Sequence, residues 1–143
     1  SPQSVEKYLG KLSGPLLDRI DLYVEVPPLE FDELSRRPQA ESSAAIKARV
    51  DKARAIQAAR FGPEGPACNS HMGPKELADF CALDGAGTAL IRDAFDRMGL
   101  TARSYDRILR VARTIADLDG AEAIGPEHLA EAIQFRNTDI LKG

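Results

Sequence analysis

The stretch TARSYDRILRVARTIADLDG, residues 101–120, predicts an amphipathic helix and is the most informative segment of the chain. At about 100° per residue, apolar and polar side chains fall on separate stripes of a helix from Ala102 to Asp119. The apolar stripe comprises Ile108, Val111, Ala112 and Ile115, and the polar stripe comprises Arg103, Arg107, Arg110 and Thr114. One face of this helix therefore packs against other elements, and the other face is cationic.

Helical periodicity continues on both sides of this segment. Further helices are predicted at residues 74–82, 84–98 and 126–135, with Gly99 as a C-cap and Gly120 after the central helix. Short connections join these helices, so residues 67–143 are predicted to form a compact C-terminal helical bundle. The chain shows no internal repeat and no low-complexity tract.

A linker helix is predicted within residues 41–66, capped by Ser42 or Ser43 and closed by GPEGP. One of its faces carries Ile46, Val50, Ala53, Gln57 and Phe61, and its basic residues are Lys47, Arg49, Lys52 and Arg54. These basic side chains are candidates for contact with a DNA backbone. Because Asp51 lies among them and the whole chain is acidic, a solvated face is the default interpretation.

Residues 1–40 have a different pattern. Ser1 and Pro2 predict the N-cap and first residue of a helix, which Gly14-Pro15 ends, and a short turn follows at residues 16–20. From Asp21 the period changes to two, which predicts one strand that stops at Pro27-Pro28. A lone strand is not stable in water, so we expect it to pair with a sheet outside this chain or in a small hairpin. A polar linker follows.

The predicted fold class is therefore mainly α: a helical bundle preceded by a linker helix and a remnant, one helix plus one strand, of an α/β core. With 43% hydrophobic residues among 143, the chain can bury a core. The formal net charge of −3 argues against a dedicated nucleic-acid-binding protein, because such proteins carry an excess of positive charge. A local basic face on one part of the chain is still compatible with this charge. The absence of an initiator methionine leads us to expect a fragment of a longer protein.

Two arginines are candidates for binding phosphate. Arg103 lies in the first turn of its helix, where free N–H groups and the helix dipole favour an anion. Arg19 lies just before the predicted strand, where it could be presented to a phosphate held by another subunit. The alternatives are a solvated arginine-rich face for Arg103, and for Arg19 a salt bridge with Asp18, Asp21 or Glu25.

Other candidates carry less chemistry. Cys68, His71 and Cys81 do not complete a metal-ligand pattern, so no metal site is predicted. His128 has no nearby nucleophile and is interpreted as structural. The two cysteines are too few for a disulfide framework, and no signal-like or membrane-length apolar run occurs, so we expect a cytoplasmic location and no membrane partner. No GxxxxGKS/T loop occurs, so the chain cannot cradle a nucleotide unaided.

The motifs YLGKLSGPLLDRIDLYVEVP, ESSAAIKARVDKARAIQ, RMGLTARSYDRILRVARTIADLDG and HLAEAIQFR, with Asn69 before a short helix, closely resemble the C-terminal part of the magnesium-chelatase-like AAA+ ATPases. The competence-related branch is more similar than the chelatase subunits of pigment biosynthesis. The resemblance implies an AAA+ helical lid at residues 67–143, a linker helix at 41–66 and the end of the AAA+ core at 1–40. The Walker motifs would then lie upstream.

The resemblance also implies roles for the two candidate arginines. Arg19, in LLDRID, matches the arginine finger that acts in trans on the nucleotide of a neighbouring subunit. Arg103, in TARSYD, matches the sensor-2 arginine that the lid presents to the ATP phosphates. The roles of Arg107 and Arg110 stay open, with the core or a neighbouring subunit as candidate contacts.

Several expectations about function follow from the same resemblance. The parent protein is expected to be an ATPase that uses ATP and Mg²⁺, whereas the fragment alone should bind neither and be inactive. Its partners would be the upstream AAA+ core, the other subunits of a homo-oligomeric, hexameric ring, and DNA. The expected function is a DNA-remodelling motor of the branch-migration type. The alternatives are a metal-inserting chelatase subunit and a non-catalytic helical interaction module that binds protein or DNA.

Overall fold

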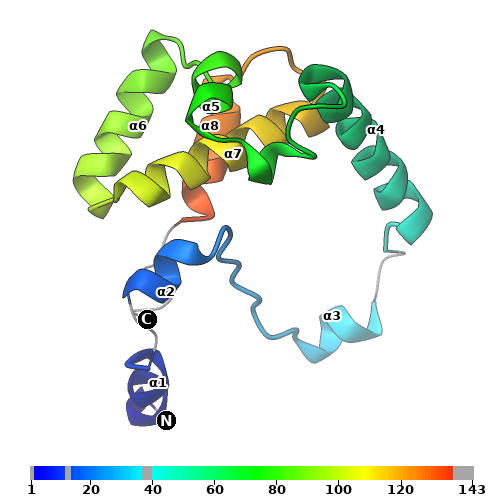
Figure 1. Ribbon diagram of the computed structural model, residues 1–143. Helices are drawn as coiled ribbons and strands as arrows, with labels where there is room; N and C mark the ends of the chain where they lie inside the picture. The colour runs from blue at the N-terminus through cyan, green and yellow to red at the C-terminus, as the bar shows by residue number, and fades with distance from the viewer. Residues whose placement is uncertain (1, 12–13, 37–39, 137–143) are drawn as a thin grey trace.

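The computed structural model describes residues 2–11, 14–36 and 40–136, and this part of the chain is mainly helical (Figure 1). The helices that follow the linker form one bundle. They are the 3₁₀ helix η1 (Asn69–His71), α5 (Pro74–Phe80), α6 (Gly85–Met98), α7 (Ala102–Leu118) and α8 (Pro126–Gln134). The sequence-based prediction of a C-terminal helical bundle is confirmed.

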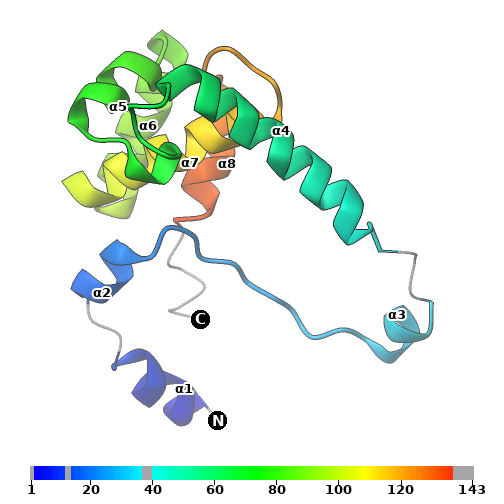
Figure 2. The same cartoon turned by 45° about the vertical axis from the view of Figure 1, so that its right-hand side comes forward.

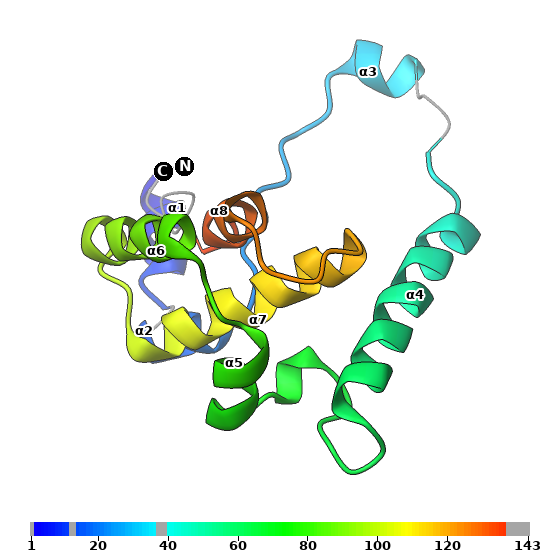
Figure 3. The ribbon, with the colours of Figure 1, turned by 90° about the horizontal axis from the view of Figure 1, so that it is seen from above.

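The central helix of the bundle is α7, which packs against α4 (Ser43–Phe61), α5 and α8. Its residues Ile108, Ala112 and Ala116 have no exposed surface, and neither do Leu129 and Ala132 of α8. Seen from above, α6 and α8 lie on one side of α7 and α4 on the other (Figure 3). Ile108 and Ala112 of the predicted apolar stripe therefore lie in the core, whereas Val111 and Ile115 pack against it and are only partly buried.

Each boundary of the bundle helices has a local cause. The Asp84 side chain accepts a hydrogen bond of 2.7 Å from Gly87 N, and the Thr101 hydroxyl accepts one of 3.1 Å from Ser104 N, which caps α6 and α7. Gly99 ends α6 in the left-handed conformation with a φ of 62°, as its predicted role as a C-cap requires.

The linker helix α4 starts after Ser42, whose hydroxyl accepts a hydrogen bond from Ala45 N, so Ser42 is the cap. Only its C-terminal half packs on the bundle, through the buried Ala53 and Gln57, and its first turns extend away from the bundle (Figure 2). Ile46 and Val50 are each 44% exposed although they share the predicted apolar face. That face is therefore only half covered in this chain.

The predicted strand at residues 21–26 is wrong for this chain: the described part of the chain contains no strand. Residues 20–30 run without regular structure, and Leu22, Val24 and Val26 are exposed. The alternation of side chains is present, but a strand needs the backbone of a neighbour to complete its hydrogen bonds. Among the described residues, the Tyr23 N–H does find a backbone partner, the carbonyl oxygen of Phe135 at the end of α8, but no extended segment lies alongside to form a ladder.

The remaining N-terminal elements are short. They are α1 (Pro2–Leu9), α2 (Gly14–Arg19) and α3 (Phe31–Ser35). The last of these lies in the predicted polar linker, where the Glu30 N–H donates to the Glu33 carboxylate at 3.1 Å across its first turn. Ser1, the predicted N-cap of the first helix, lies outside the described residues. No helix in the described ranges is long and apolar enough to span a membrane.

Candidate functional site

Arg103 lies in the first turn of α7, beside the capping hydroxyl of Thr101, and its side chain is exposed. It makes no hydrogen bond or ion pair with another residue in the described part of the chain. The N-terminus of a helix carries partial positive charge, which a guanidinium in the first turn adds to. Arg103 is thus placed where a solvent-borne anion can reach it.

Arg19 is the last residue of α2 and is also exposed. The sequence offered Asp18, Asp21 and Glu25 as salt-bridge partners for it. In the structure, Asp21 instead pairs with Arg107 of α7, and Arg19 has no ion pair with any described residue. The guanidinium of Arg19 is therefore available to an external group.

The other two arginines of the cationic stripe are engaged within the chain. Arg107 pairs with Asp21, and Arg110 donates from Nε and Nη2 to the carbonyl oxygen of Met72 at 3.2 and 3.0 Å. Thr114 donates to the Arg110 carbonyl oxygen at 2.8 Å and accepts from Asn69 Nδ2 at 3.1 Å. The stripe is therefore mainly a packing surface. Of its three arginines, only Arg103 makes no hydrogen bond or ion pair with a described residue.

Arg136, two residues after the end of α8, connects the regions around the two candidate arginines. Its guanidinium donates to the carbonyl oxygen of Ile20 and, at 3.3 Å, to the hydroxyl of Ser104. The ring of Tyr23 lies 4.8 Å from its central carbon. These contacts join the segment after Arg19 to the first turn of α7, next to Arg103. Sequence reasoning assigned no role to Arg136, although it ends the quoted motif HLAEAIQFR.

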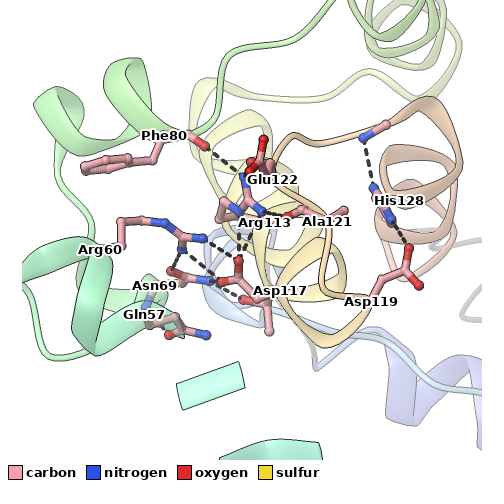
Figure 4. Close-up of polar contacts among 12 residues, drawn as sticks. Gln57, Arg60, Asn69, Phe80, Arg113, Asp117, Asp119, Ala121, Glu122 and His128 are labelled. Carbon is pink, nitrogen blue, oxygen red and sulfur yellow. Dashed lines mark hydrogen bonds and ion pairs between the residues drawn. The ribbon is translucent and has the colours of Figure 1, made fainter. Parts of the chain in front are cut away.

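A buried polar cluster joins α4, η1 and the C-terminal end of α7 (Figure 4). Asp117 is its centre: its carboxylate accepts from Arg60 at 3.0 and 2.5 Å, from Asn69 Nδ2 at 2.9 Å and from Arg113 Nε at 3.1 Å. Burial alone would raise the pKa of Asp117. Hydrogen bonds from Arg60 and Asn69 and the charge of Arg113 outweigh burial, so its pKa lies below the ordinary value.

Arg113 is 2% exposed and also donates to the carbonyl oxygens of Ala121 and Glu122, at 2.7 and 3.0 Å. It belongs to neither predicted stripe of α7, and the sequence analysis missed it. Its spacing of four residues from Asp117 is the signal that would have found the pair. All of its polar contacts are internal, so the cluster holds the bundle together and offers no free group to a ligand.

Cys68 is half-buried and Cys81 is buried, and both are free thiols. Cys68 Sγ lies 3.1 Å from the Ser70 hydroxyl, which lowers the pKa of the thiol, while burial raises the pKa of Cys81 to about 11. No group of three or more potential metal ligands occurs within the described ranges. The buried His128 accepts a hydrogen bond of 2.9 Å from Gly125 N at Nδ1, and its Nε2 lies 2.8 Å from Asp119, as a structural role requires (Figure 4).

Two family models match the chain. Residues 40–136 match the family described as the C-terminal part of magnesium chelatase subunit ChlI, and residues 1–34 match the family described as magnesium chelatase subunit ChlI. Together they cover the bundle, the linker helix and the segment with Arg19.

Curated relatives match over nearly the full length of the chain. It is 42% identical over 137 residues to the competence protein ComM of Haemophilus influenzae, covering 95% of this chain and 26% of the relative. It is 37% identical over 142 residues to the protein YifB of Escherichia coli, covering 99% of this chain and 27% of the relative. It is 39% identical over 132 residues to a protein of Mycobacterium tuberculosis, covering 92% of this chain and 26% of the relative. The chain thus spans about a quarter of the length of these relatives.

Proposed function

Because the chain belongs to the magnesium chelatase ChlI family, we propose that it is the lid and arginine-finger part of a ring-forming AAA+ ATPase. The proposed units are the end of the AAA+ core at residues 1–40, the linker helix at 41–66 and the lid at 67–143. The whole protein would form a homo-oligomeric, hexameric ring in the cytoplasm. The phosphate loop and the metal-binding acid would belong to its upstream core.

The observation that carries this proposal is the pair of exposed, unengaged guanidinium groups of Arg19 and Arg103. Arg107, Arg110 and Arg136 are all held by carbonyl oxygens, a hydroxyl or a carboxylate of the chain. Arg19 and Arg103 lie on elements joined to each other through Arg136, yet neither has an ion pair with a described residue. Unpaired arginines at such a junction fit a polyanionic ligand supplied from outside the chain.

The two arginines would act on different nucleotides. Arg103, in the first turn of α7, would bind a phosphate of the ATP held by the core of its own subunit, and so close the lid. Arg19 would reach the ATP of the neighbouring subunit and stabilise the charge that develops on the transferring phosphoryl oxygens. ATP and Mg²⁺ supply the chemistry when they are bound to the upstream core.

Within this proposal, we favour a motor that remodels DNA by branch migration. The support is the relative named a competence protein, which is 42% identical to this chain. The alternative, a chelatase-type subunit that drives metal insertion, is supported by the description of the matching family. Both alternatives use the same lid chemistry, and they differ in the substrate on which the energy of ATP is spent.

Arg103→Ala in the whole protein tests the proposed nucleotide contact. The variant should bind ATP more weakly and close the lid less completely, because a ligand shifts an equilibrium only through contacts that differ between its states. Arg97→Ala is the matched control: Arg97 is an exposed arginine of the lid that pairs with Asp93. If affinity, turnover and lid position are all unchanged in Arg103→Ala, Arg103 is an ordinary surface residue.

A third class of function, an autonomous DNA-binding module, is tested on the chain itself. Phosphate contacts release counterions, so such a module would bind duplex DNA with a steep dependence on salt concentration. The proposed lid should show little of this binding and no ATPase activity. Robust ATP turnover by the purified chain would contradict the proposal.

A further inference from the structure

Arg136 contacts the chain on both sides of the junction between α2 and α7, and it is only 4% exposed. On the α2 side its guanidinium donates to the carbonyl oxygen of Ile20 and, at 3.5 Å, to that of Leu17. These two carbonyls flank Arg19 in the sequence. On the α7 side it donates at 3.3 Å to the hydroxyl of Ser104, the residue after Arg103.

The buried guanidinium of Arg136 is paired with neutral groups and not with a carboxylate of the described ranges. No carboxylate of the described ranges pairs with Arg136, and its Nε has no hydrogen-bond partner there. Its charge is met by carbonyl dipoles, a hydroxyl and the face of Tyr23. Burial of a charge is costly, and an apolar side chain of similar size would fill the same space without that cost. A planar fork, however, fixes the carbonyls and the hydroxyl that it spans in one arrangement.

Other contacts hold the same segment in place. The Tyr23 N–H donates to the carbonyl oxygen of Phe135 at 2.8 Å, and the Tyr23 hydroxyl donates to that of Leu17. Asp21 pairs with Arg107, one turn along α7 from Arg103. Residues 17–23 are thereby fastened to α7 and to the end of α8, although they contain no regular structure after Arg19.

We propose that Arg136 is a positioning residue that makes α2 and the first turn of α7 one rigid unit, so that Arg103 and Arg19 move together. Because this link attaches α2 to the lid, α2 shifts with the lid relative to the rest of the core. When Arg103 closes on the nucleotide of its own subunit, the same movement therefore carries Arg19 toward the nucleotide of the neighbouring subunit. The state of one site therefore sets the activity of the next. This inference rests on the proposed roles of Arg19 and Arg103, and it adds a physical link between them.

The test uses the whole protein with Arg136→Lys and Arg136→Met. Arg136→Lys keeps the positive charge but lacks the planar guanidinium. Arg136→Met keeps much of the length of the side chain but lacks both the charge and the guanidinium. In each variant kcat should fall about tenfold or more while KM for ATP changes less than about twofold, because Arg103 still meets its own nucleotide. Hydrogen exchange should become about tenfold faster at the Tyr23 amide while the amides of α7 stay protected.

Arg113→Lys is the control for a merely structural effect. Arg113 is another buried arginine of the bundle that binds carbonyl oxygens, but none of its polar contacts involves residues 14–23. This variant should melt at a lower temperature than the wild-type protein, with kcat and Tyr23 exchange close to wild type. If Arg136→Met does not fold, Arg136→Lys carries the test on its own.

Arg19→Ala separates the two levels of the proposal. Suppose that Arg19→Ala loses turnover. If the Arg136 variants then keep the wild-type kcat, or if their Tyr23 amide exchanges at the wild-type rate, the positioning role is overturned and the proposed function stands. If Arg19→Ala itself hydrolyses ATP normally, the finger role fails and the coupling fails with it. Loss of kcat and faster Tyr23 exchange in both Arg136 variants, with neither in Arg113→Lys, supports the inference.

Discussion

Arg60 of α4 holds the buried carboxylate of Asp117 of α7 with both terminal nitrogens of its guanidinium, at 3.0 and 2.5 Å. The two residues are 57 positions apart in the sequence, and the Asp117 side chain has no exposed surface. This pair fastens the linker helix to the centre of the bundle. It lies in a cluster separate from the junction that contains Arg136.

Arg60→Ala should lower the free energy of unfolding of the chain by about 3 kcal/mol, because it leaves a buried carboxylate with one cation fewer. Urea denaturation followed by circular dichroism measures this change. The control is Arg49→Ala in the same helix, whose ion pair with Glu41 is exposed and should be worth less than about 1 kcal/mol. Equal losses in the two variants would show that the pair with Asp117 does not fasten α4.

The lowered pKa of Asp117 predicts a loss of stability in acid. A carboxyl whose folded pKa is depressed stabilises the fold fully above its unfolded value, about 3.9, and loses that contribution as the pH falls through the folded value. The difference in unfolding free energy between the wild-type chain and Asp117→Asn should be constant above about pH 5 and should shrink below about pH 4. Asp93→Asn, at an exposed carboxyl that pairs with Arg97, is the control for the loss of a surface ion pair and should change the unfolding free energy by less than about 1 kcal/mol. A difference independent of pH would contradict the assignment.

The two thiols should differ in reactivity. The pKa of Cys81 is raised to about 11 by burial, whereas that of Cys68 is lowered by the Ser70 hydroxyl. Since the thiolate is the nucleophile, iodoacetamide at neutral pH should label Cys68 well before Cys81 in the folded chain. Mass spectrometry of the digested chain measures both rates, and labelling in urea is the control in which the two should converge. Equal labelling in the folded chain would place Cys81 outside the core.

The bundle was predictable because its signals are local. The periodicity of residues 101–120 and the C-cap Gly99 depend on near neighbours, and the helices begin and end close to the predicted bounds. The structure adds Asp84 and Thr101 as the N-caps, which are also local signals. The prediction of a strand at residues 21–26 was wrong, because a strand depends on a neighbouring strand as well as on its own alternation of side chains. The short α3 lacks periodicity of its own and depends on Glu30 and Glu33.

The site was predictable only in part for the same reason. Arg19 and Arg103 were chosen as candidates from local sequence and a family resemblance, and the structure adds that both are exposed and have no ion pair with a described residue. The link between them was not predictable, because Arg136 and Ile20 are 116 positions apart and no local pattern connects them. The alternative salt bridge of Arg19 with Asp21 was plausible from spacing, but Arg107 takes that carboxylate through tertiary packing.

The role of Arg19 is tested most directly by mixing two inactive variants of the whole protein. Arg19→Ala should bind ATP but lose turnover by about 10³-fold or more, and Arg19→Lys should rescue it poorly, because an ammonium lacks the planar fork. The second variant is defective only in the phosphate loop that we propose for the upstream core. ATP turnover of the mixed rings should recover in part, since an intact finger then faces an intact nucleotide site at some interfaces. If the mixture stays inactive although mixed rings form, or if Arg19→Ala hydrolyses ATP normally, Arg19 does not act across the subunit interface.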